Sequence, residues 1–119
     1  MSAISKSQSY RSAIDALVRM CYSGQGQVGA NRFRTGVWNA NASPGFLPEQ
    51  HAVNEVLARL SPEDRAILAD VLVQEVRLGV FETLKVLEQF GVEPFQDGYE
   101  GSAYHDFVGR LGGWQWPQL

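Results

Sequence analysis

Three side chains that could move protons lie close together near the end of the chain. Glu100, His105 and Asp106 combine one imidazole with two carboxylates, the groups that most often act as general acids and bases. Asp106 also precedes Arg110 by four residues, the spacing of an ordinary ion pair on a helix surface. Proximity in the sequence is weak support for a catalytic group. We therefore assign these residues, with Tyr104, to an alternative function only.

Possible metal ligands occur at a second place. His51 and Glu55 are four residues apart and would share one face of a helix. His105 and Asp106 could complete a ligand set for one ion. The chain lacks the Glu-x-x-His motif of ferritin-like bundles. Solvated polar faces explain the same residues, and we expect neither a metal nor a cofactor.

Two further motifs have simple structural interpretations. Residues 24–29 match the pattern G-x-G-x-x-G, but phosphate binding by that pattern needs a strand before it and a helix after it. Here a predicted helix precedes it and a loop follows, so we interpret it as a flexible loop. Cys21 lies on the apolar stripe of that helix, which is typical of a small core residue rather than a reactive thiolate.

One short motif combines basic and aromatic side chains. Arg32 and Arg34 flank Phe33 in a segment that also contains Asn and Gly. Such a motif can hold phosphates and stack a base, but it can also attach its segment to the acidic half of the chain. We favour the second interpretation, keep Arg32, Phe33 and Arg34 as candidates for a contact with a protein partner, and do not expect nucleic acid as a partner.

Trp38, Trp114 and Trp116 are many tryptophans for a chain of 119 residues. Tryptophan is enriched among the few interface residues that contribute most of the binding energy. The simpler interpretation is that these rings cover the core of a small helical protein. Both interpretations stay open, and the three residues remain candidates for a binding surface.

Charge is unevenly distributed along the chain. Residues 1–60 hold six basic and three acidic groups, whereas residues 61–119 hold four and ten, and the net charge is −3. A protein that binds nucleic acid over its whole surface is usually basic. The two halves either attract each other within the fold, which we favour, or leave an acidic face for a basic partner.

Helical periodicity accounts for most of the chain. Apolar residues recur at i, i+3, i+4 and i+7 within residues 5–22, 49–60, 62–90 and 103–111. Pro48 and the pair Ser61-Pro62 are typical of helix starts. The longest helix carries Gly79, where we expect a bend or a change of the packed face, because the apolar residues before it centre on Ile67, Leu68, Val71 and Leu72.

Residues 23–48 show no periodicity and are rich in Gly, Asn, Ser and Pro, which predicts a loop. Since 26 residues are too many for an ordinary connection, we expect an ordered loop with apolar anchors.

The fold expected from these elements is all-α, a single compact domain over residues 1–119 with four or five helices and the long ordered loop after the first. Composition is 45% hydrophobic with one cysteine, so an internal disulfide framework is excluded. No apolar run approaches the roughly 18 residues of a membrane span, and we expect a cytoplasmic protein.

The function favoured by the sequence is that of a non-enzymatic protein-binding module, of adaptor, inhibitor or immunity type. It would act through a helical surface and the 23–48 loop. The alternative is a small enzyme or ligand-binding domain with its site around Glu100, Tyr104, His105 and Asp106. We also expect a homodimer with part of the 62–90 helix or the tryptophan-bearing tail at the seam.

Overall fold

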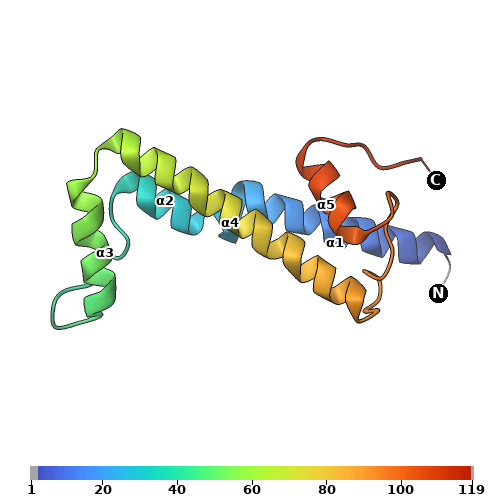
Figure 1. The fold of residues 1–119 in the computed structure, drawn as a ribbon, viewed down its shortest axis with the longest axis horizontal. Coiled ribbons are helices and arrows are strands. Elements are labelled where there is room, and N and C mark those ends of the chain that lie inside the picture. Colours follow the sequence, from blue (N-terminus) through green and yellow to red (C-terminus); the bar gives the residue numbers. More distant parts are fainter. Residues whose placement is uncertain (1–2, 119) are drawn as a thin grey trace. The chain divides into compact units, whose positions relative to one another are not determined.

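Five α-helices and one short 3-10 helix form the regular structure of residues 3–118, the part of the chain that the computed structural model describes (Figure 1). Side chains are described from residue 8 onward. The elements are α1 (Ala3–Ser23), η1 (Gln25–Gln27), α2 (Val28–Thr35), α3 (Pro48–Arg59), α4 (Pro62–Gln89) and α5 (Ala103–Leu111). Since these residues contain no strand, the all-α prediction is confirmed.

The helices fall into two compact units. Unit 1 takes the chain up to Tyr22 and from Arg77 onward, and so holds α1, the last part of α4, α5 and the C-terminal segment. Unit 2 takes Ser23–Val76, and so holds η1, α2, α3 and the first part of α4. Each unit has its own buried residues. One domain over residues 1–119 stays a prediction.

The core of unit 1 is built from the stripe predicted for the first helix. Ile14 and Cys21 of α1 are fully buried, together with Leu84 of α4 and Phe107 of α5. Burial raises the pKa of the Cys21 thiol, although the positive charge of Arg77 opposes that shift. Cys21 therefore has the environment of a core residue, as expected.

Residues 25–35 are helical, so the loop predicted over residues 23–48 is wrong for that part. Ala30 and Phe33 stand one turn apart on α2 and pack against Ala69 and Val73 of α4. Two apolar positions are too few to give a periodic signal, and the glycines of the segment are typical of loops. A loop remains over residues 36–47.

α4 runs unbroken over Pro62–Gln89, and its buried residues Ala69, Val73 and Leu84 share one stripe. The half-buried apolar residues beside that stripe lie on one side before Gly79, at Leu72, and on the other side after it, at Phe81, which agrees with a change of the packed face. Ile67 and Val71, which we expected in the core, are 62% and 46% exposed. The small Ala69 lies inside instead, because α2 packs closely there.

Gly79 lies inside α4, and nothing lies within 4 Å of the position that a Cβ would take. Replacing Gly79 with alanine should therefore raise the free energy of unfolding by about 1 kcal/mol, since alanine loses less backbone entropy in a helix. Thermal unfolding followed by circular dichroism measures the change. A lower melting temperature in the variant would mean that the helix needs glycine at this position.

Candidate functional site

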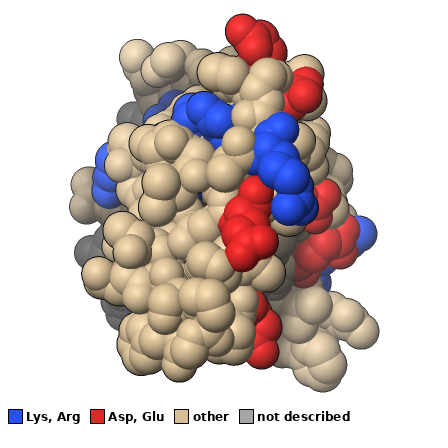
Figure 2. Space-filling model, turned by 90° about the vertical axis from the view of Figure 1, so that its left-hand side faces the viewer, with Lys and Arg blue, Asp and Glu red and all other residues tan. Residues whose placement is uncertain are grey.

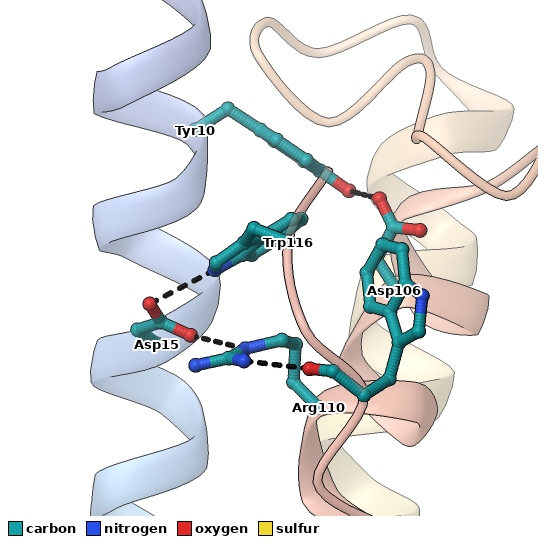
Figure 3. A network of polar contacts seen from close by, with 6 residues as sticks. Tyr10, Asp15, Asp106, Arg110 and Trp116 are labelled. Atoms are coloured by element: carbon teal, nitrogen blue, oxygen red, sulfur yellow. Dashed lines mark hydrogen bonds and ion pairs between the residues drawn. The ribbon is translucent and has the colours of Figure 1, made fainter. Parts of the chain in front are cut away.

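A buried carboxylate joins three segments of unit 1. Asp106, in the first turn of α5, is fully buried. Its Oδ2 accepts a hydrogen bond from the Tyr10 hydroxyl of α1 at 2.6 Å (Figure 3). Oδ2 also accepts one from the Tyr99 amide at 2.7 Å, and Oδ1 accepts one from the Glu100 amide at 3.0 Å. The predicted surface pair of Asp106 with Arg110 is therefore wrong, and the carboxylate ties α1 and the preceding loop to α5.

A close approach of the backbone makes this arrangement possible. A Cβ on Gly98 would lie 2.4 Å from the carbonyl oxygen of Ser102 and 2.8 Å from Oδ2 of Asp106. Only glycine leaves room for these atoms. The loop can then aim the amides of the next two residues at the carboxylate, which stands at the positive end of α5.

Burial raises the pKa of the Tyr10 phenol, and the hydrogen bond to the Asp106 carboxylate raises it further. In the unfolded chain the phenol titrates near pH ~10. Above that pH the unfolded chain loses a proton that the folded chain keeps, so the stability linked to Tyr10 is present below pH ~10 and is lost as the pH rises.

Denaturant unfolding on either side of pH ~10 should therefore show a steeper alkaline loss of stability in the wild type than in Tyr10→Phe. Equal alkaline losses in the two proteins would contradict this environment for Tyr10.

A second polar contact network holds the C-terminal segment of unit 1. Oδ1 of Asp15 on α1 accepts a hydrogen bond from Nε of Arg110 at 2.8 Å, and its Oδ2 accepts one from Nε1 of Trp116 at 3.0 Å. Nη1 of Arg110 donates to the Trp114 carbonyl at 2.6 Å. Figure 3 shows Trp116 between α1 and α5. These contacts fit tryptophans that cover the core of unit 1.

Arg11 strengthens the attachment of this segment. Its guanidinium carbon lies 4.8 Å from the ring centroid of Tyr99 and 5.3 Å from that of Trp116. Its Nη2 donates to the Pro117 carbonyl at 2.5 Å. Two cation–π contacts and a hydrogen bond to the backbone thus hold the Arg11 guanidinium within unit 1.

The residues of the predicted acid/base group have different roles in the structure. Asp106 is buried and accepts three hydrogen bonds, whereas His105 is exposed. Glu100 is exposed and meets Asp106 through its backbone amide. Tyr104 packs edge-on against Phe81, with ring centroids 5.1 Å apart. Glu100 and Asp106 therefore meet through the Glu100 backbone amide, and this contact positions the loop backbone.

His51 and Glu55 are in contact on α3, with 2.6 Å between Nε2 and Oε1. Such a pair is an ordinary contact on a helix surface. Within the described part of the chain, no three His, Cys, Asp or Glu side chains gather in a way that could hold a metal ion.

The basic–aromatic motif makes its contacts inside unit 2. Arg34 lies 3.7 Å from the Asp70 carboxylate of α4, and its Nη1 donates to Oδ1 of Asn31 at 2.8 Å. The Arg32 guanidinium lies 5.2 Å from the Trp38 ring, which meets the Phe33 ring edge-on at 5.8 Å. These contacts agree with internal attachment to the acidic half.

One asparagine of α3 holds the loop of residues 36–47. Oδ1 of Asn54 accepts the amides of Trp38 at 2.7 Å and Asn39 at 3.1 Å, and its Nδ2 donates to the Asn39 carbonyl at 2.7 Å. The Asn39 side chain donates to Oε1 of Gln50 at 2.7 Å. The start of the loop is therefore fixed to α3.

The end of the same loop presents an exposed aromatic ring. Ser43 and Phe46 exchange two backbone hydrogen bonds of 2.8 Å and 3.1 Å, which close a tight turn around Pro44 and Gly45. We call residues 43–46 the Phe46 turn. The Phe46 side chain is 58% exposed. Leu47 follows with a φ of 58°, a strained conformation for a residue with a Cβ.

An open apolar groove of about 300 Å³ lies beside α3 in unit 2. Val56 and Leu68, which help to line it, are 46% and 38% exposed, although both belong to the apolar periodicity of residues 49–60 and 62–90. We call it the α3 groove; its lining consists of Phe33, Ala52, Val53, Val56, Leu57, Leu60 and Leu68. Figure 2 looks onto the side on which α3 lies, and much of that surface carries no charged side chain.

Sequence reasoning missed this surface for a physical reason. Helical periodicity identifies an apolar stripe but does not tell whether a neighbouring helix covers it. Only Leu57 of the predicted stripe on α3 is fully buried. The Pro44-Gly45 pair is a turn signal that could have drawn attention to Phe46.

Comparison with known proteins identifies a family whose function is unknown. Residues 4–118 match the model of a family of unknown function, DUF6547. Neither a curated protein nor a solved structure matches the chain. Among the described helices none has the length and apolar character needed to cross a membrane.

Proposed function

The chain belongs to the DUF6547 family, and on that premise we propose that it is a non-enzymatic protein-binding module. The binding surface consists of the α3 groove and the Phe46 turn, both within unit 2. We also propose a cytoplasmic location.

The observation that carries this proposal is an entirely apolar groove left open on a helix surface. Val56 and Leu68 lose their contact with water only if a further apolar surface covers them. An apolar groove beside an exposed aromatic ring is a candidate interaction site on a soluble protein. The geometry suits an apolar side chain or one face of a helix.

The loop beside the groove is arranged before any partner arrives. Asn54 fixes the start of the loop through three hydrogen bonds, and the turn at Ser43 and Phe46 closes its end. A segment held in one conformation loses little entropy when it binds. Phe46 therefore has the properties of an anchor residue in an interface.

The enzymatic alternative has weaker support in the geometry. The Asp106 carboxylate accepts three hydrogen bonds that position α1, the preceding loop and α5. A general base needs a lone pair that a substrate can reach, and the Asp106 side chain is fully buried.

Native electrophoresis of extracts from the host cell tests the proposal. We expect the tagged chain to migrate in a complex larger than itself, and Val56→Glu to release it, because a carboxylate in the groove opposes apolar contact. Gln74→Glu places the same charge on an exposed residue of α4 and should leave the complex intact.

A chain that migrates alone, or a complex that withstands Val56→Glu, would contradict binding through the α3 groove. Circular dichroism of both variants confirms that they are folded.

A further inference from the structure

We propose that the occupant of the α3 groove is a second copy of this chain, with the Phe46 turn of each copy seated in the groove of the other. This inference rests on the proposed function and names the partner. Unit 2 carries both sides of such a contact, an exposed ring and an apolar groove of about 300 Å³. A two-fold axis makes the contact twice, because each copy offers the same surface to the other.

The positions of ring and groove along α3 fit this symmetry. Phe46 lies just before the first turn of α3, whereas Val56 and Leu60 line the groove near the last turn. A two-fold axis perpendicular to two α3 helices relates them in antiparallel orientation. The start of one helix then lies beside the end of the other, which brings each Phe46 turn toward the Val56 end of its partner.

Charge complementarity supports the same antiparallel pairing. Glu49 in the first turn of α3 stands three residues before Ala52, and Arg59 in the last turn stands three residues after Val56, so both border the groove side. Antiparallel pairing places Glu49 of each copy near Arg59 of the other. Opposite charges at the rim of an interface fix its register.

The outer face of α4, which the sequence predicts as a seam, fits a second copy less well. Leu78 is 49% exposed and shares that face with Ile67 and Val71. Glu75 follows Val71 by four residues and so borders the same face. Two copies joined near Val71 would bring these carboxylates together, which opposes association.

Sedimentation velocity of the purified full chain over a range of concentrations tests the inference. We expect a monomer–dimer equilibrium, with Phe46→Asp and Val56→Asp each raising the Kd at least about tenfold. Phe90→Asp and Leu78→Asp replace residues of the same class with similar exposure outside the contact, and should leave the Kd unchanged. A monomer at every concentration, or dissociation caused by Leu78→Asp alone, would overturn the inference.

Charge reversal gives an independent test that does not depend on the apolar residues. Glu49→Arg and Arg59→Glu each create two like-charge contacts per dimer and should raise the Kd about three- to tenfold. The double variant restores opposite charges and should return the Kd to that of the wild type. Both side chains are exposed, so folding should be unaffected. Weakening in the double variant would contradict antiparallel pairing.

The two proposals fail in different ways. If the purified chain is a monomer while a complex that Val56→Glu disrupts persists in extracts, the protein-binding function stands and the second copy is wrong. If neither the dimer nor that complex forms, the proposed function itself fails.

Discussion

Gly98→Ala should lower the free energy of unfolding by about 3 kcal/mol or more, the largest effect expected of any single methyl group in this chain. The added Cβ would lie 2.4 Å from the Ser102 carbonyl, where only backbone could move away. Moving that backbone also pulls the Tyr99 and Glu100 amides from the Asp106 carboxylate and leaves a buried charge short of donors.

Denaturant unfolding followed by circular dichroism measures this loss. Gly45→Ala is the matched control, because nothing lies within 4 Å of its Cβ position and its φ is not positive. If Gly98→Ala unfolds at the same denaturant concentration as Gly45→Ala, the close approach of the 97–101 loop to α5 is wrong.

Asp106→Asn should lower the free energy of unfolding by about 2–4 kcal/mol, although the two side chains have nearly the same shape. An amide has one acceptor oxygen where the carboxylate has two. In either orientation its nitrogen would face a backbone N–H, that of Tyr99 or that of Glu100, which cannot accept a hydrogen bond, inside a fully buried site. The expected effect thus comes from an unsatisfied donor rather than from lost packing.

Asp97→Asn makes the same chemical change on an exposed residue one position before Gly98 and should stay within about 0.5 kcal/mol of the wild type. Thermal and denaturant unfolding of the two variants in parallel give the comparison. Equal stabilities would mean that Asp106 does not hold the three segments together.

Local sequence signals were sufficient for the helices that begin and end with clear caps. Ser61 Oγ accepts the Asp64 amide at 3.0 Å, and Pro62 opens α4, as the sequence predicts. The inner face of α4 could not be predicted, because Ile67 and Val71 are more apolar than Ala69 yet lie outside. Which stripe is buried depends on how closely α2 approaches, and that distance is a tertiary property.

The sequence was sufficient to select some residues of the candidate sites, but not to predict the role that each one has in the fold. Asp106 drew attention as an acid near a histidine, and the structure gives it a buried position whose partner Tyr10 is 96 residues away in the sequence. Asn54 gave no signal at all, although its three hydrogen bonds shape the loop before α3. Such contacts follow from the folded arrangement and leave no periodic pattern in the chain.

Site-specific photo-cross-linking in the host cell tests most directly whether the α3 groove binds protein. A photoreactive amino acid at position 56 places the probe in the groove, and the same residue at position 74 places it on an exposed part of α4. We predict a discrete protein adduct from position 56, of twice the mass of the chain if the partner is a second copy, and none from position 74. The absence of any protein adduct at position 56, or equal adducts from both positions, would contradict the account.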